Sequence, residues 1–167
     1  MDSTLILPFI KSTQNIFGTM FQMEVSCGAP EVKRSEHPSH DVSAIISMSG
    51  DIEGSVVLSF PMDTARRAVA VFTGSDGPMS DEDLSDAVGE LVNMIAGGAK
   101  AQFQGRNVAI SCPSVVIGPS HAVFGAKDIV RVVIPCSCDC GDFNVEVLIK
   151  PGKNAAKTAA GAASSAA

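Results

Sequence analysis

Hydrophobic residues between positions 80 and 105 recur with the period of an α-helix. Ser80 is a residue type that caps helix N-termini, and Asp83 stands three positions later, where the second partner of a capping box is found. Gly105 follows the last periodic position, as a helix-ending glycine commonly does. The pattern predicts one long helix over residues 80–105 with a single buried stripe. The stripe consists of Leu84, Val88, Leu91, Val92, Ile95 and Ala99.

The opposite side of this predicted helix carries polar and small residues. Successive residues of an α-helix turn by about 100°, so Asp86, Glu90, Asn93 and Gly97 cluster away from the stripe. Glu90 and Asn93 are three positions apart, and their side chains should lie side by side and point outward. The pattern therefore places the strongest candidates for chemistry on an exposed helix face.

Three glycines, Gly89, Gly97 and Gly98, stand close to these two residues. A glycine inside a helix costs roughly 0.5–1 kcal/mol relative to alanine. Two compensating roles fit the pattern. The glycines either keep the surface flat for a binding partner or allow a neighbouring helix to pack closely.

The rest of the chain divides into helical and strand-like segments. Further helices are predicted over residues 3–20 and over residues 61–73, the second ending at Gly74. Ser3 or Thr4 could cap the first of these, and Pro8 fits the pattern only if the helix begins near it, because proline is tolerated in the first turn of a helix. Strand-like patterns cover residues 22–27, 42–60 (as a hairpin), 108–117, 128–136 and 143–150, and residues 28–40 are expected to form a loop or irregular edge.

Local signals set the pairing of these strands. Gly50-Asp51 and Gly141-Asp142 are predicted hairpin turns. Serines alternate with apolar residues in the 42–60 hairpin, which indicates one sheet face in the core and one nearer water. Pro113 makes residues 108–117 an edge strand or two half-strands, and Val130 is expected to share a face with the apolar residues after it. Hairpins favour antiparallel pairing, so the predicted class is α+β, with helices packed on one face of a mostly antiparallel sheet in two layers.

Composition limits the other possibilities. The chain has 167 residues, of which 46% are hydrophobic, enough for one domain over residues 1–150. Residues 151–167 are rich in Ala, Ser and Gly and are expected to form a disordered tail. The net charge of −6 and the lack of a basic patch argue against nucleic-acid binding. Without a long apolar run or a secretory signal pattern, no membrane association is predicted, and a cytoplasmic location is expected.

Five cysteines are present, and Cys136, Cys138 and Cys140 occupy alternate positions. On a strand these three thiols would share a face, which raises the possibility of a metal site. Zinc sites favour wider spacings between paired cysteines, and no second cluster of Cys or His stands nearby. Reduced thiols near a strand end are therefore the favoured interpretation, and no metal site is predicted.

Standard hydrolase motifs are absent from the sequence. It has no G-x-S-x-G pattern, no phosphate-binding glycine loop and no H-x-x-x-H pair. If Glu90 and Asn93 take part in catalysis, the remaining reacting groups must come from a partner. An amide can hold a water molecule with one donor and one acceptor, and it adds no negative charge beside a phosphate.

The motif Asp86-x-x-x-Glu90-x-x-Asn93, followed by MIAGGAK, resembles the signature helix of the CheC/CheX/FliY family of chemotaxis phosphatases. The segment PFIKSTQNIFGTMF and the hairpin GDIEGSVVLSFP stand in the same order as in that family, and the resemblance extends to the C-terminal strands. A single copy of the motif in a chain of this length is similar to the CheX-like members. The resemblance implies a CheC/CheX-like fold and a protein aspartyl-phosphate phosphatase.

The implied substrate is a phosphorylated CheY-type response regulator in chemotaxis signalling. The resemblance implies that Glu90 docks against a lysine of the regulator and that Asn93 orients the attacking water. Mg²⁺ would be held by the regulator, and the chain would need no cofactor of its own. A homodimer joined through sheet edges is also implied. Residues expected to contact the regulator around the catalytic pair are Asp86, Gly89, Met94 and Gly97.

Two alternatives remain beside the phosphatase. A non-catalytic adaptor or binding module of the same fold, in signalling or the flagellar switch, would hold a partner without chemistry. Glu90 and Asn93 could also be an ordinary solvated pair, as the motif alone would most often be.

Overall fold

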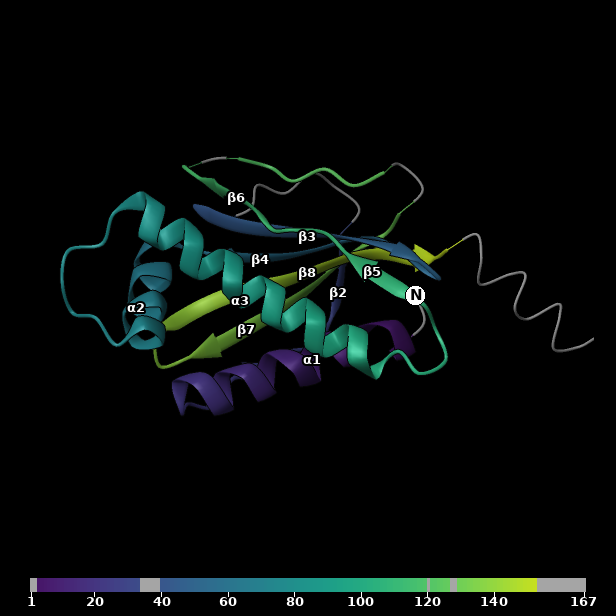
Figure 1. Cartoon of the computed structure of the whole chain (residues 1–167), viewed down its shortest axis with the longest axis horizontal. Coiled ribbons are helices and arrows are strands. Elements are labelled where there is room, and N and C mark those ends of the chain that lie inside the picture. The colour runs from purple at the N-terminus through teal and green to yellow at the C-terminus, as the bar shows by residue number, and fades with distance from the viewer. Residues whose placement is uncertain (1–2, 34–39, 120, 127–128, 153–167) are drawn as a thin grey trace, which may run out of the picture.

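The structure, a computed structural model, describes residues 3–33, 40–119, 121–126 and 129–152 (Figure 1). In this part of the chain, no helix has both the length and the apolar character needed to cross a membrane. The helical elements are α1 (Ser3–Ile16), the π-helical turn η1 (Phe17–Phe21), α2 (Met62–Thr73) and α3 (Asp81–Gln102). The strands are β1 (Ser26–Cys27), β2 (Glu31–Lys33), β3 (Val42–Gly50), β4 (Ile52–Phe60), β5 (Val108–Ile110), β6 (Ser114–Ile117), β7 (Arg131–Cys138) and β8 (Gly141–Pro151).

The described strands form one 8-stranded sheet in the order β1-β7-β8-β4-β3-β5, with β2 also pairing with β7 and β6 with β3. All these pairings are antiparallel. The helices α1, α2 and α3 lie on the same side of the sheet (Figure 1). The predicted class, α+β with helices on one face of an antiparallel sheet, is confirmed.

The long helix forms as its pattern predicts. The six residues of the apolar stripe are buried, and the predicted capping box joins Ser80 and Asp83. The helix ends earlier than expected, because Phe103 is its C-cap and turns into the core, where it is 7% exposed. Gly105 has a positive φ of 70° and lies in the turn that follows, so its predicted role as the helix-ending residue is wrong.

The helix α1 runs antiparallel to α3 and is joined to it by hydrogen bonds. The Ser12 hydroxyl donates to the Ile95 carbonyl at 2.8 Å, and the Gln102 amide donates to the Pro8 carbonyl at 3.2 Å. The helix begins at Ser3, as predicted, and Pro8 lies inside it beyond the first turn, where no proline was expected from the sequence. Residues before the proline are held in the helix by their burial, since Leu5 and Ile6 are 3% and 5% exposed.

The three glycines of α3 have different surroundings. A Cβ atom on Gly98 would collide with Ser12 Oγ, so this glycine allows close packing of α1. A Cβ on Gly89 would lie 3.5 Å from both Pro113 and Val115. A Cβ on Gly97 would have no neighbour within 4 Å. Close packing thus explains Gly98, and an open surface remains at Gly97.

A cluster of phenylalanines connects the helical layer to the sheet. Phe17 of η1 stacks on Phe143 of β8 with ring centroids 5.0 Å apart, and Phe143 also contacts Phe60 of β4 at 5.0 Å. Phe21 stacks on Phe17 at 4.4 Å and on Phe72 of α2 at 5.7 Å. Aromatic pairs of this kind contribute about 0.5–1.5 kcal/mol each beyond the area they bury. The cluster therefore fixes the ends of α1 and α2 against the sheet.

Several local predictions need correction. The strand expected over residues 22–27 is reduced to Ser26–Cys27, because Gln22 adopts a left-handed backbone with φ of 53°. Part of the 28–40 segment forms the edge strand β2. Cys138 pairs with Gly141, so Asp139 and Cys140 form the turn predicted at Gly141-Asp142. Val130 precedes β7 and is 47% exposed, which separates it from the apolar face of that strand.

The face of the sheet turned away from the helices is partly covered rather than open to water. Ser43 and Ser59 are both 0% exposed, whereas the alternation of serines with apolar residues predicted that they lie nearer water. Their hydroxyls lie 3.2 Å apart, and Ser43 Oγ is also 2.8 Å from His121 Nε2. The segment after β6 thus supplies a hydrogen-bond partner for Ser43, and the His40 backbone N–H donates to Ser59 Oγ at 2.9 Å.

The same outer face contains a buried ion pair between β7 and β8. Arg131 Nε lies 3.4 Å from Glu146 Oε2, and their side chains are 10% and 5% exposed. The pKa of the Glu146 carboxyl is raised by burial, an effect that Arg131 and His121 partly oppose. A carboxylate removed from water to this extent is costly, and its partner offsets only part of the cost.

Because Gly97 and Gly98 have different surroundings, replacing each by alanine should change the free energy of unfolding in opposite directions. Gly98→Ala should lower the free energy of unfolding by about 1–3 kcal/mol, because the new methyl group collides with Ser12. Gly97→Ala should raise it by roughly 0.5–1 kcal/mol, since alanine is the better helix former and meets no neighbour. Urea unfolding of both variants measures the two changes. Equal changes would contradict this account of the glycines.

The raised pKa of Glu146 predicts a pH-dependent effect of Glu146→Gln. A carboxyl whose folded pKa lies above its unfolded value supports the fold fully below that unfolded value. This support is lost as pH rises through the folded pKa. The stability of the variant relative to the unsubstituted protein should therefore increase as pH rises above about 4.5, the ordinary value for this group.

Urea unfolding across a range of pH measures this difference. Glu24→Gln is the matched control, because it removes the same charge from an exposed position. If the stability of the two variants relative to the unsubstituted protein changed equally with pH, burial of Glu146 would not be the cause.

Candidate functional site

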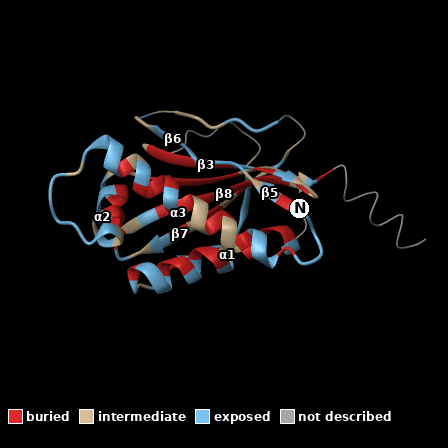
Figure 2. Ribbon diagram, in the orientation of Figure 1, coloured by how far each residue is buried: buried red, intermediate tan, exposed pale blue. Residues whose placement is uncertain are grey.

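The polar face of α3 projects from the helical layer. Asp86 and Glu90 are exposed, and Asn93 and Gly97 are half-exposed. Figure 2 shows buried, intermediate and exposed stretches alternating along α3. The apolar stripe on the other side of the helix is buried in the core. Burial of the stripe sets the rotation of the helix, so these four residues are held outward on a rigid element.

The start of α3 is fixed by its cap. The Asp83 backbone N–H donates to Ser80 Oγ at 3.1 Å, and the Ser80 N–H donates to the Asp83 carboxylate at 3.1 Å. Hydrogen bonds from the Ser80 hydroxyl and backbone keep the pKa of Asp83 below its usual value. The helix dipole also stabilises a negative charge at this end of the helix. The helix carrying the candidate residues is thus well defined from its first turn.

Glu90 and Asn93 are available to an outside molecule. In the described part of the chain, neither side chain makes a hydrogen bond or an ion pair. Binding a partner would therefore break no internal contact of these groups. Their chemistry is that of one carboxylate and one neutral amide on a convex helix, which can orient water or a cation but holds no nucleophile of its own.

The other two predicted contact residues are less open. Gly89 is buried beside Pro113 and Val115, and Met94 is half-buried and packs against the core. The structure therefore brings Asp86, Glu90, Asn93 and Gly97 together as one surface. The segment at Pro113 and β6 borders this surface. The sequence marked Pro113 only as an interruption of a strand, so its place beside the helix was not predicted.

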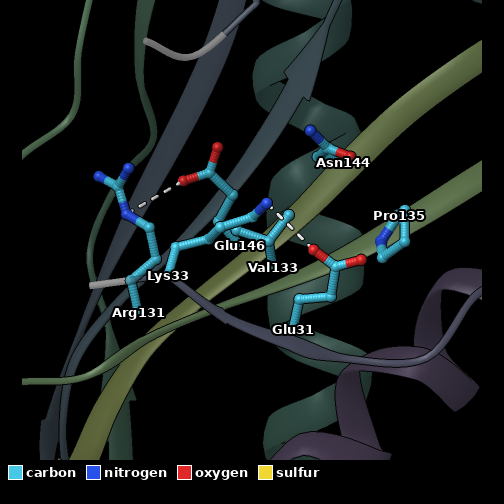
Figure 3. Close-up of a pocket in the computed structure, with 7 residues that line it drawn as sticks. All are labelled: Glu31, Lys33, Arg131, Val133, Pro135, Asn144 and Glu146. Atoms are coloured by element: carbon cyan, nitrogen blue, oxygen red, sulfur yellow. Dashed lines mark ion pairs between the residues drawn. The ribbon is translucent and has the colours of Figure 1, made fainter. Parts of the chain in front are cut away.

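A polar pocket of about 230 Å³ lies on the outer face of the sheet, away from α3 (Figure 3). Val132 and Ile134 of β7 face the core, and the alternating residues face this pocket. Its charged groups form ion pairs with one another, Lys33 with Glu31 at 3.0 Å and Arg131 with Glu146. The lining residues are Glu31, Lys33, Arg131, Val133, Pro135, Asn144 and Glu146.

Nothing in the sequence analysis pointed to this pocket. The single available signal was Glu146, an acidic residue between the apolar residues of the last strand. The pocket and the predicted polar face therefore lie on opposite sides of the sheet and do not form one site.

The three alternating cysteines do not gather metal ligands. Cys136 and Cys138 lie in β7, and Cys140 lies in the turn that follows. Across the described residues, no group of three or more His, Cys, Asp or Glu side chains could hold a metal ion. All five cysteines are free thiols.

A family model described as chemotaxis phosphatase CheX matches residues 42–137. The chain is 29% identical to the CheY-P phosphatase CheX of Thermotoga maritima over 155 residues, covering 91% of this chain and 99% of that protein. The crystal structure of a chemotaxis protein CheX from Desulfovibrio desulfuricans is similar, with a TM-score of 0.80 and 31% identity over 88% of this chain and 98% of that one.

A CheX from Borrelia burgdorferi, in a crystal structure of a CheX–CheY–BeF3–Mg²⁺ complex, has the same fold. The TM-score is 0.73 at 22% identity, covering 87% of this chain and 97% of that chain.

Proposed function

The chain belongs to the chemotaxis phosphatase CheX family, and on that premise we propose that it hydrolyses the aspartyl phosphate of a CheY-type response regulator. The Thermotoga maritima relative is a CheY-P phosphatase. The Borrelia burgdorferi CheX forms a complex with CheY. The observation that carries the proposal is the exposed face of α3, on which Glu90 and Asn93 project without internal partners in the described part of the chain.

Asn93 would position the nucleophile. In the proposed complex its side chain enters the regulator's active site and orients a water molecule in line with the bond between phosphorus and the aspartyl oxygen. The water oxygen bonds to phosphorus as that bond breaks, which releases inorganic phosphate and restores the aspartate. Phosphoryl transfer depends mainly on positioning and compensation of charge. A neutral amide can position the water without adding a negative charge beside the phosphoryl group.

Glu90 would align the two proteins. Its exposed carboxylate has no internal ion pair in the described residues, so it can pair with a lysine of the regulator without losing an existing contact. Glu90 lies about one helical turn from Asn93, so such a contact would also set the position of the amide. Asp86 and Gly97 would border the contact, and the packing of Gly89 and Met94 would support it from beneath.

The cation of the reaction would belong to the regulator. The Borrelia burgdorferi complex contains Mg²⁺ together with CheY. The acidic residues on the polar face of α3 are Glu82, Asp86 and Glu90, all exposed, and the described residues contain no group of three or more side chains that could hold a metal ion. This fits a helix that approaches a metal-bearing site. The homodimer and the cytoplasmic location expected from the sequence stay predictions.

Substitution of the amide tests the mechanism. Asn93→Ala should lower the rate of regulator dephosphorylation by about 10²-fold, because misplacement of the attacking water has effects of this size. The fold should be unchanged, since the side chain has no internal hydrogen bond. Decay of radiolabelled phosphate on a purified CheY-type regulator measures the rate.

The control variant is Asn15→Ala, which removes the same side chain from an exposed position on α1. An Asn93→Ala protein that dephosphorylates as fast as this control would contradict the proposal. Binding of the regulator by the unsubstituted protein without faster decay would favour the adaptor alternative instead.

The open surface at Gly97 predicts a second, graded effect. Gly97→Leu should weaken binding of the regulator at least about tenfold, because a bulky side chain beside Asn93 would hold the two surfaces apart. Gly97→Ala should have a smaller effect. Neither should destabilise the protein, since leucine and alanine both favour the helix over glycine.

Calorimetric titration with the regulator measures the affinities, and urea unfolding checks the fold. Unchanged affinity in Gly97→Leu would place the contact surface elsewhere.

A further inference from the structure

Two thiols face each other across the edge of the sheet. Cys27 of β1 is the direct cross-strand partner of Cys136 in β7. Their Sγ atoms are 3.5 Å apart, with the Cys136 thiol donating to Cys27. Cys136 is 4% exposed, and Cys27 is half-buried. One thiol of the pair is thus accessible and the other is enclosed.

The register of the strands suits a covalent bond between these thiols. The next residue, Gly28, donates its N–H to the Pro135 carbonyl at 2.8 Å. This bond flanks the cysteine pair, which places the pair at a non-hydrogen-bonded position of the ladder. Cα atoms at such positions are about 4.5 Å apart. Disulfides span Cα separations of about 4.4–6.8 Å, so closure needs little backbone movement.

The two thiols also differ in reactivity. The hydrogen bond from Cys136 lowers the pKa of Cys27, which favours its thiolate. The hydrogen bond to Cys27, together with burial, raises the pKa of Cys136. Oxidation of cysteine follows thiolate character and exposure. Cys27 therefore has the properties of an attacking thiol, and Cys136 those of a resolving thiol.

The remaining cysteines are less suited to this chemistry. Cys140 Sγ lies 3.9 Å from the thioether of Met23, and burial raises its pKa. Cys138 Sγ contacts the Gly141 carbonyl at 3.6 Å. Cys112 is exposed on a different segment, so its oxidation shows how reactive a thiol is when exposure is its only advantage.

We propose that Cys27 and Cys136 are a redox modification site, at which a peroxide converts the two thiols to a reversible disulfide. The Cys27 thiolate attacks one peroxide oxygen, the O–O bond breaks, and Cys27 becomes a sulfenic acid as the first water leaves. The sulfur of Cys136 then attacks the Cys27 sulfur, loses its proton and displaces the second water. Two thiols are oxidised by one electron each, and one peroxide is reduced to two waters.

The disulfide would lock a marginal strand in place. The strand β1 consists of only Ser26–Cys27 and is separated by residues 22–25 from η1, the helical turn that contributes to the phenylalanine cluster. The bond would also close a long loop that contains α2, α3 and most of the sheet. Cross-links that close long loops restrict the unfolded chain most. Oxidation should therefore raise the melting temperature and leave the α3 surface unchanged.

Peptide mapping of the oxidised full chain tests the proposal. The reduced protein is exposed to limiting hydrogen peroxide, its remaining thiols are alkylated without reduction, and the digest is analysed by mass spectrometry. The expected product is the Cys27 peptide joined to the Cys136 peptide, abolished by dithiothreitol. The control variant Cys112→Ser should give the same product. Oxidation of Cys112, or a Cys138–Cys140 cross-link, while Cys27 and Cys136 remain alkylatable would overturn the proposal.

Two variants separate the chemical steps. Cys136→Ser should form no disulfide, and its Cys27 sulfenic acid should be trapped by dimedone. Cys27→Ser replaces the more exposed thiol, and circular dichroism checks its fold. Its melting temperature should not respond to peroxide, whereas that of the unsubstituted protein should rise. An equal rise in Cys27→Ser would overturn the assignment of the pair.

Discussion

Burial of the apolar stripe of α3 is the constraint on which the arrangement of the molecule depends. All six residues of the stripe are 0% exposed, packed where the sheet and α1 meet. A side chain of this kind contributes roughly 1.5–3 kcal/mol when fully buried. No other rotation of the helix would bury the same set. The outward direction of Glu90 and Asn93 is therefore a consequence of core packing and not of any interaction made by those two residues.

The same physics explains what could be predicted from the sequence. Helix rotation, the capping box and the 42–60 hairpin depend on neighbours within a few residues, and all three were predicted correctly. Pro8 was misjudged because long-range burial of Leu5 and Ile6 outweighs a local preference. The burial of Ser43 was missed because its hydroxyl contacts His121, far along the chain. Local patterns carry no information on such distant partners.

The glycines show how one local pattern supports different causes. Gly97 and Gly98 are adjacent, yet a Cβ at one meets open space and at the other meets Ser12. Successive residues of a helix point about 100° apart, so neighbours in sequence face different surroundings. Sequence reasoning left the choice between a flat surface and close packing open for the whole group. In the structure, close packing explains Gly98, and Gly97 lies on an open surface.

A convex helix face has consequences for how a phosphatase of this kind would achieve selectivity. Neither Glu90 nor Asn93 lines the polar pocket of about 230 Å³, which lies on the other side of the sheet. A free phosphate ester in solution would meet one carboxylate and one amide, neither of which holds it. Electrostatic stabilisation is effective where water is excluded and donors are preorganised. In the proposed complex, those conditions would arise when the helix closes against a second protein that already holds the phosphoryl group. Under the proposed function, specificity would therefore be set by the fit between two protein surfaces, and the rigidity of α3 would set how accurately Asn93 is placed.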